Sequence, residues 1–200
     1  MLENYLKFLE YLTNMLNKQF SAQAPFMACK KGCAKCCQNG DYPFSEIEIK
    51  LLKQGFSQLS LDKQNEIKQK IKSIVDAKTL SSEKEFTYEC PFLCDDVCSV
   101  YDYRGIICRT FGLIYINKGG KMQIPFCAYE GLNYSNVLDE ETNQLSLEKM
   151  AELGIEQEPK AYNIRYDVVT ADDIAEAFGF NFGKKTSLID LLSRDDVFKL

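Results

Sequence analysis

Nine cysteines in a chain of 200 residues that has no histidine constrain this fold more than any other feature. Most are crowded into two clusters, and two follow as single residues: Cys29, Cys33, Cys36 and Cys37, then Cys90, Cys94 and Cys98, then Cys108 and Cys127. A cysteine in an ordinary core behaves as a small apolar residue and has no reason to recur every three or four positions. Such crowding is instead typical of metal ligands.

The composition of the chain limits which ligands these thiols can bind and which reactions they can take part in. We find neither a secretory signal nor a stretch near the roughly 18 apolar residues that span a membrane, so we expect a cytoplasmic location. Cytoplasmic thiols stay reduced, and the odd count also argues against a disulfide framework. Without histidine, thiolates or carboxylates must hold any metal, and histidine-dependent catalysis is excluded. The expected cofactor is therefore zinc or an iron–sulfur cluster, both of which accept four thiolates.

The charge of the chain limits its partners. A net charge of −5 and a pI near 5.0 argue against nucleic acid, because phosphate binding relies on clustered lysine and arginine. We expect a metal ion or cluster as the partner, and neither nucleic acid nor a membrane. No particular protein partner is indicated.

The first cluster contains an adjacent pair, Cys36 and Cys37. Neighbouring side chains point apart on a helix or a strand, so we do not expect both to ligate one mononuclear ion. One of them would serve a second site, bind another iron of a cluster, or remain free. Lys30, Lys31 and Lys35 either offset the negative charge of four thiolates around a divalent ion or are simply solvated.

The second cluster begins with Cys90 and Pro91. Proline disfavours helix at the residue before it but is common at the first position of one, so a helix is predicted to start here. Cys94 and Cys98 would then share one helical face.

Two arginines follow the second cluster. Tyr101, Arg104 and Cys108 fall at helical spacing, which would place a phenol, a guanidinium and a thiol side by side. We predict Arg104 and Arg109 as cofactor-binding residues that neutralise the metal site or dock an anionic substrate. The alternative is that they form ordinary salt bridges with nearby aspartates. No catalytic residue can be assigned.

The apolar pattern predicts helices in the first part of the chain. Over residues 2–20, apolar side chains recur at three- and four-residue steps, which favours a core helix. Ser45 and Glu48 form a capping box for a second helix over 46–54, and Gly55 is predicted to end it.

Further elements follow along the chain. A third helix is predicted after Ser60. Gly119 and Gly120 separate two short strand patterns, which predicts a β-hairpin. Short helical patterns begin near Ser146 and near Thr170.

The expected fold class is mainly α with a small β-hairpin (α+β), in a compact single domain organised around a cysteine-ligated metal site. The domain is predicted to span residues 1–200. Its metal-binding core would cover about 26–127, and a C-terminal helical extension about 128–200.

At its cysteine motifs, the chain resembles the YkgJ-like cysteine-cluster family, a CxxCxxCC zinc- or iron-chelating domain. The resemblance covers about residues 26–112. Its matching segments are Cys29 to Cys37, Cys90 to Leu93, Cys98 to Tyr101, and Arg104 to Arg109. It implies metal-ligand roles for Cys29, Cys33, Cys36, Cys37, Cys90, Cys98 and Cys108.

The chain departs from this pattern in three ways. Cys94 and Cys127 are not part of it. Three residues rather than two separate Cys29 from Cys33, and Gly105 stands where a proline often follows the arginine.

Three functions are consistent with the sequence. The first is a metal-binding protein whose zinc or iron–sulfur site holds the fold together or carries metal. The second is an enzyme, either an iron–sulfur redox enzyme or a protein-lysine methyltransferase-like enzyme, since flagellin lysine methylases have a related cysteine pattern. The third is a thiol redox sensor, in which lysine and arginine depress cysteine pKa values.

Overall fold

The computed structural model describes residues 1–29, 32–83 and 85–200. Its helices are α1 (Leu2–Ala22), α2 (Lys35–Gln38), α3 (Glu46–Ser57), α4 (Leu61–Leu80), α5 (Ile106–Thr110), α6 (Leu147–Glu152), α7 (Tyr166–Val169), α8 (Asp172–Phe178) and α9 (Leu188–Leu192). The strands are β1 (Pro43–Ser45), β2 (Leu93–Cys94), β3 (Val97–Cys98), β4 (Tyr115–Ile116), β5 (Met122–Gln123), β6 (Leu138–Asp139), β7 (Gln144–Leu145) and β8 (Lys185–Ser187). The pairs β1–β8, β2–β3, β4–β5 and β6–β7 are all antiparallel. The predicted α+β class, helical with small strand pairs, is confirmed.

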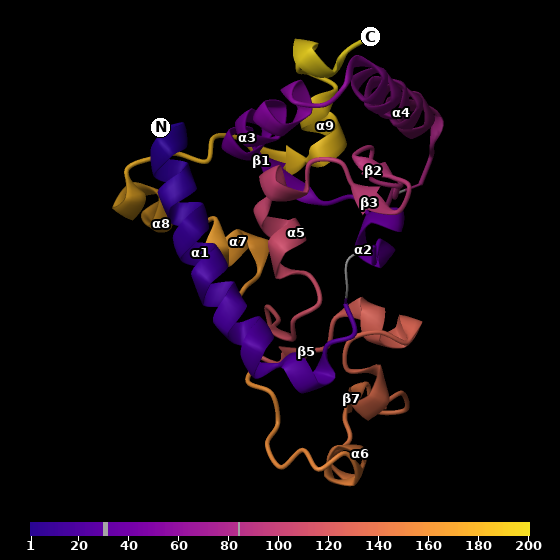
Figure 1. The fold of residues 1–200 in the computed structure, drawn as a ribbon, viewed down its shortest axis with the longest axis vertical. Helices are drawn as coiled ribbons and strands as arrows, with labels where there is room; N and C mark the ends of the chain where they lie inside the picture. Colours follow the sequence, from indigo (N-terminus) through magenta and orange to yellow (C-terminus); the bar gives the residue numbers. More distant parts are fainter. Residues whose placement is uncertain (30–31, 84) are drawn as a thin grey trace.

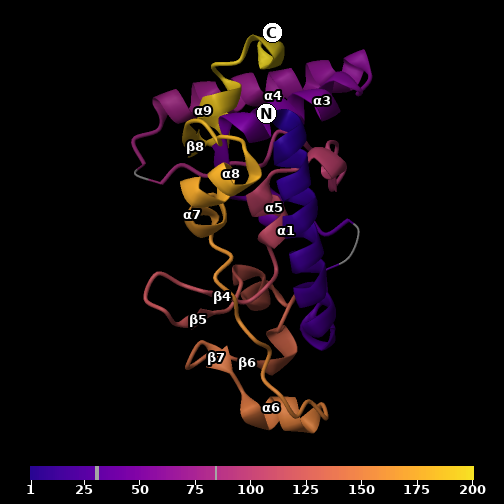
Figure 2. The same ribbon diagram turned by 90° about the vertical axis from the view of Figure 1, so that its left-hand side faces the viewer.

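The elements spread along one long axis. Helices α3, α4 and α9 gather at one end, and α6 with β7 lies at the other (Figure 1). Figure 2 shows α1 running along this axis beside α5, with which it is in contact. None of the described helices combines the length and the apolar run that crossing a bilayer requires.

Helix α1 covers the first of three hydrophobic clusters. Its buried face includes Tyr5, Leu12 and Leu16, as the apolar periodicity predicts. The rings of Tyr5 and Phe180 meet edge to face at 5.5 Å between centroids. The C-terminal part of the chain therefore returns to pack against the first helix.

Helix α3 carries the predicted capping box, but its end differs from the prediction. The Ser45 amide donates to Glu48 Oε2 at 2.8 Å, and the reciprocal bond to the Ser45 side chain is also present. The helix does not stop at Gly55 and continues to Ser57. Gly55 is needed for packing instead, because a Cβ there would lie 2.6 Å from Tyr103 Cγ.

The helices predicted after Ser60, Ser146 and Thr170 and the predicted β-hairpin are present, with small changes. Ser60 caps α4 by accepting from the Lys63 amide, and Ser146 caps α6. The hairpin around Gly119 forms between β4 and β5. Near residue 170 the cap is Ala171, so the helix begins one residue later than predicted.

Candidate metal centre

Five cysteines from distant segments approach one another and form what we call the first thiol group. Its members are Cys36 and Cys37 on α2, Cys90 before β2, Cys98 on β3 and Cys108 on α5. The backbone joins the two sequence clusters directly, since the Cys90 amide donates to the Cys37 carbonyl at 2.8 Å. Charges on Cys90, Cys98 and Cys36 all affect the Cys108 thiol. The fold thus brings together five of the cysteines named from the sequence.

The adjacent pair does not diverge as predicted. Cys36 Sγ and Cys37 Sγ lie 3.9 Å apart on the short helix α2. With Zn–S bonds of about 2.3 Å, two thiolates on one tetrahedral ion stand about 3.8 Å apart. The expectation that the two side chains point apart is therefore wrong, and the expectation that they do not share one ion stays a prediction. Within a single helical turn, rotation about χ1 brings neighbouring sulfurs together.

In the metal-free protein, the surroundings raise the pKa of four members of the first thiol group, Cys36, Cys90, Cys98 and Cys108, which favours their protonated form. Burial raises the pKa of Cys90 to about 12 and that of Cys108 well above its ordinary value. A hydrogen bond with Cys37, together with burial, raises the pKa of Cys36. A metal ion would displace these protons on binding.

The segment carrying Cys94 and Cys98 is a hairpin rather than the predicted helix. Strands β2 and β3 pair Leu93 with Cys98. Asp95 and Asp96 form the turn, with φ angles of 51° and 58°. Positive φ at both central residues is the conformation that suits the twist of a two-residue hairpin. Cys94 and Cys98 therefore do not share a helical face.

The predicted alignment of Tyr101, Arg104 and Cys108 on one helix is also wrong. A 3₁₀ turn over Tyr101–Tyr103 ends at Arg104, whose backbone is extended, and α5 begins separately at Ile106. The Arg104 guanidinium stacks on the Tyr101 ring, 3.8 Å from its centroid. Its positive charge opposes the rise that burial causes in the pKa of Cys98.

Arg109 makes contacts that hold α5 in place. Its guanidinium donates to the carbonyls of Arg104 and Asp102, at 3.1 and 3.0 Å. It also reaches Thr13 Oγ1 on α1 at 3.4 Å. Its donors are thus directed at protein groups, and a cofactor-binding role for either arginine stays a prediction.

Glu48 holds the start of α5 near the cysteines, a role that its position in the sequence does not reveal. Its side chain is fully buried, and Oε1 accepts from the Ile106 amide at 2.8 Å, at the start of α5. Oε2 accepts from the Tyr166 hydroxyl at 2.5 Å and from Ser45. Burial raises the pKa of Glu48, and these donors oppose that rise. The capping box predicted the bond to Ser45 but not those to Ile106 and Tyr166.

Cys29, Cys33 and Cys127 form what we call the second thiol group. The side chains of Cys127, Asn133 and Cys33 are the polar neighbours that lower the pKa of Cys29, against the effect of burial. The interaction with Cys127 is the main reason why the pKa of Cys29 is lowered to about 6. The predicted ligand set does not contain Cys127, because this residue is not part of the family pattern and a single cysteine far along the chain carries no spacing signal. Asn133 was missed for the same reason.

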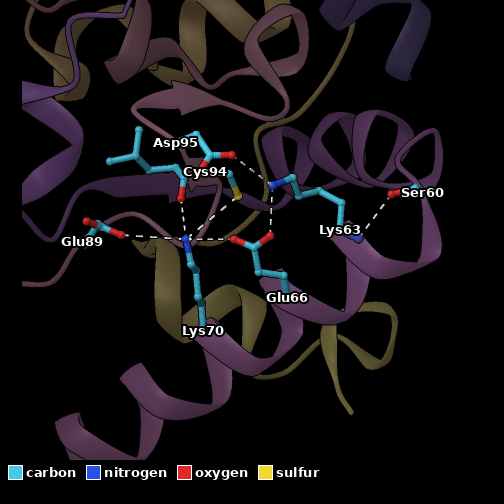
Figure 3. Close-up of polar contacts among 8 residues, drawn as sticks. Ser60, Lys63, Glu66, Lys70, Glu89, Cys94 and Asp95 are labelled. Carbon is cyan, nitrogen blue, oxygen red and sulfur yellow. Dashed lines mark hydrogen bonds and ion pairs between the residues drawn. The ribbon is translucent and has the colours of Figure 1, made fainter.

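Cys94 belongs to neither group. It is buried, and Lys70 Nζ lies 3.9 Å from its sulfur while donating to the Leu93 carbonyl at 2.6 Å. Figure 3 shows this lysine among the carboxylates of Glu66 and Glu89, at 3.3 and 3.9 Å. These contacts fasten the β2–β3 hairpin to α4.

In neither thiol group, as the structure describes it, do the side chains have the spacing that a bound metal ion requires. Within residues 1–29, 32–83 and 85–200, no three thiol or carboxylate side chains are spaced as ready metal ligands. Side-chain rotation would have to complete the arrangement. Of the lysines expected to offset thiolate charge, Lys30 and Lys31 lie outside the described residues, and Lys35 pairs with Glu130 at 3.3 Å.

Thiolates are the ligands that both zinc and iron–sulfur clusters accept, so the donor chemistry of these residues fits either group. The family model CxxCxxCC, described as "Putative zinc- or iron-chelating domain", matches residues 28–128. That span includes every cysteine of both thiol groups. No curated protein and no solved structure matches the chain.

Proposed function

Because the chain belongs to the CxxCxxCC family of zinc- or iron-chelating domains, we propose that it binds zinc or an iron–sulfur cluster through the first thiol group. The observation that carries this proposal is the convergence of α2, the β2–β3 hairpin and α5 on five thiols. Ordinary packing does not require five thiols at one place.

The fold supports such a site from several sides. Cys90, Cys98 and Cys108 pack against the hydrophobic cluster that includes Phe44 and Phe92. This surrounding apolar layer limits access of water to the sulfurs, which strengthens their attraction to a cation. When bound, the metal would supply cross-links between three segments that are far apart in the sequence. Glu48 and Arg109 hold α5, and so Cys108, in position beside the other thiols.

The test is elemental analysis and an ultraviolet–visible spectrum of protein purified without oxygen. Stoichiometric iron and sulfide with broad absorption near about 400 nm would identify a cluster, and colourless protein with stoichiometric zinc would identify zinc. Protein that holds no metal, even after anaerobic reconstitution with either, would overturn the proposal.

Two serine variants test whether the metal binds at the first thiol group or at any thiol of the chain. Cys108→Ser should lose metal from the first thiol group. Cys94→Ser should keep the wild-type metal content, because Cys94 is buried beside Lys70 and outside both groups. Equal metal loss in both variants would contradict the assignment of the ligands.

A further inference from the structure

Asp41 joins four segments of the chain through one carboxylate. Its Oδ1 accepts from the Tyr88 hydroxyl at 2.9 Å and from the Ser187 hydroxyl. Its Oδ2 lies 3.7 Å from the ammonium group of Lys78, near the end of α4. The Asp41 side chain is 25% exposed, and Tyr88 is buried. Because hydrogen bonds to a carboxylate are stronger than those between neutral groups, this side chain ties the four segments together.

Two of these segments carry cysteines of the first thiol group. Asp41 follows Cys37 by four residues, and Tyr88 precedes Cys90 by two. The Gly40 amide donates to the Tyr88 carbonyl at 3.1 Å, in an antiparallel bridge. The Cys90 amide donates to the Cys37 carbonyl at 2.8 Å. The bond from Tyr88 to Asp41 adds a side-chain contact to this backbone pairing, so the two cysteines are held as neighbours by contacts that involve neither sulfur.

Further contacts of Tyr88 and Lys78 lead to the C-terminal part of the chain. The Tyr88 hydroxyl, which donates to Asp41, also accepts from the Ile189 amide at 3.2 Å. Lys78, which faces Asp41, pairs with Asp190 at 2.9 Å. Asp41 is therefore linked to α9 both through the phenol and through the lysine.

The C-terminal segment, by which we mean residues 185–192, comprises β8 and α9. It lies beyond residues 28–128, which the family model matches. Strand β8 pairs with β1, and the Leu188 amide donates to the Tyr42 carbonyl at 2.9 Å. Helix α9 lies beside β1 and α4 (Figure 1). A segment outside the family domain thus packs on the residues that follow the first cysteine cluster.

One arrangement of the chain serves both the metal and the C-terminal segment. An ion bound by Cys37 and Cys90 requires that residues 37–42 and 88–90 stay together. Docking of the C-terminal segment on Asp41 and Tyr88 requires the same. Two events that favour one arrangement strengthen each other by the same factor.

We propose that Asp41 and Tyr88 are positioning residues for the first thiol group, and that through them metal binding and docking of the C-terminal segment stabilise each other. This inference rests on the proposed function and deepens it, because it names how the affinity of that site is regulated. Bound metal holds the C-terminal segment more tightly, and loosening of the segment lowers the affinity for metal.

The first experiment is hydrogen–deuterium exchange of the full chain, metal-free and after anaerobic loading with Zn²⁺. Peptides covering the C-terminal segment should exchange at least about 5-fold more slowly when zinc is bound, which is the low end of typical coupling between two sites. Helix α6, at the opposite end of the molecule, is the internal control and should not change (Figure 1). Equal exchange rates of the C-terminal segment in both states would overturn the inference.

Tyr88→Phe tests the positioning role without altering a thiol. The variant loses the bonds to Asp41 and Ile189 but keeps the backbone pairing with Gly40. It should weaken, by about 10–100-fold, the binding of the zinc equivalent that Cys108→Ser loses, as loss of a supporting residue does. It should also remove the slower exchange that zinc causes in the C-terminal segment.

Tyr134→Phe is the matched control. The Tyr134 hydroxyl also accepts from a backbone amide, that of Ile114, at 3.2 Å, and Tyr134 is fully buried in the third hydrophobic cluster. This variant should lose a similar amount of stability but keep the affinity for the zinc equivalent that depends on Cys108. An equal loss of affinity in both tyrosine variants would show general destabilisation, and the inference would be wrong.

Variants of Asp41 and Ser187 test the same link from its two ends. Asparagine at position 41 keeps an oxygen that accepts from Tyr88 and Ser187 and loses the charge that faces Lys78. The zinc affinity of Asp41→Asn should therefore stay closer to wild type than that of Asp41→Ala. Ser187→Ala, which changes only the C-terminal side, should weaken zinc binding by about 2–30-fold. Wild-type affinity in all three variants would contradict the coupling.

The outcomes separate this inference from the proposed function. If zinc binds through Cys108 but neither slows exchange of the C-terminal segment nor binds more weakly in Tyr88→Phe, the inference fails and the first thiol group stands. If wild type binds no Zn²⁺ but takes up a reconstituted cluster, the inference is overturned and the proposed function remains. If wild type takes up neither, both proposals fail.

Discussion

The buried carboxyl group of Glu48 accepts a hydrogen bond from the backbone amide of Ile106 at 2.8 Å, and Cys108 follows two residues later. This contact joins the first turn of α3 to the start of α5. The same carboxyl group accepts from the Tyr166 hydroxyl, so α7 is held at the same point. Cys108, a proposed metal ligand, is thus positioned by a residue 60 positions earlier in the chain.

Replacing Glu48 with glutamine should destabilise the protein. The amide nitrogen would face donors from Ser45 and Tyr166, or, if the side chain flips, the amide of Ile106. A buried donor left without an acceptor costs about 1–3 kcal/mol, so we expect the free energy of unfolding to fall by about 1–3 kcal/mol. Urea denaturation measures this. The control is Glu46→Gln on the exposed face of the same turn, with an expected change within about 0.5 kcal/mol. Similar values for both variants would refute the role of Glu48.

Gly105→Ala should also destabilise the protein, for a steric reason. A Cβ at this position would lie 2.7 Å from Phe44 Cζ and 2.8 Å from Glu48 Oε1. Overpacking of this kind costs about 1–3 kcal/mol. Gly119→Ala is the matched control, since Gly119 is exposed and a Cβ there would meet only the Asn117 side chain, at 3.3 Å, so stability should change little. Thermal melts of both variants decide the matter, and an unchanged midpoint for Gly105→Ala would contradict this packing.

The same glycine shows what local sequence could and could not reveal. Its φ of −67° is one that proline adopts, which agrees with the proline often found there in the family pattern. The Phe44 ring occupies the space that a proline ring would need. Only the tertiary packing of β1 on α5 explains why this chain has glycine.

The helices were predictable because their signals are local. The capping box at Ser45, the cap at Ser60 and the apolar face of α1 all depend on residues within a few positions of each other. Which cysteines lie close together in the fold was harder to predict from the sequence. Cys127 and Asn133 both interact with Cys29, and no spacing within a motif reports interactions over that sequence distance.

The β2–β3 hairpin was mistaken for a helix because cysteines four residues apart also suit a helical face. Its turn residues, Asp95 and Asp96, are not the Asn-Gly or Asp-Gly that signals such a hairpin. Both nevertheless adopt positive φ.

Asp96→Gly should therefore stabilise the protein. The left-handed conformation costs a non-glycine residue roughly 1–2 kcal/mol, whereas glycine pays no steric penalty but loses more backbone entropy. The net gain should be up to about 1 kcal/mol. Asp102→Gly is the opposite case, since Asp102 has a negative φ in a 3₁₀ turn, and it should lower stability by about 0.5–1 kcal/mol. Chemical denaturation should give opposite signs for the two variants. A loss of stability in Asp96→Gly would show that the turn is not as described.

Cys29 should be the most reactive thiol of the metal-free protein near pH 7. It is exposed, and hydrogen bonding from Cys127 lowers its pKa to about 6, so the nucleophilic thiolate dominates above pH 6 and disappears as the pH falls through that value. Peptide mapping after brief iodoacetamide treatment should show its labelling rate level above pH 7 and falling below pH 6. In Cys127→Ala the main cause of the shift is gone, and the midpoint should move upward. A midpoint that stays near 6 in this variant would mean that Cys127 does not contact Cys29.

Protection of Cys29 by added Zn²⁺ in wild type, with less protection in Cys127→Ala, would tie this reactivity to metal binding.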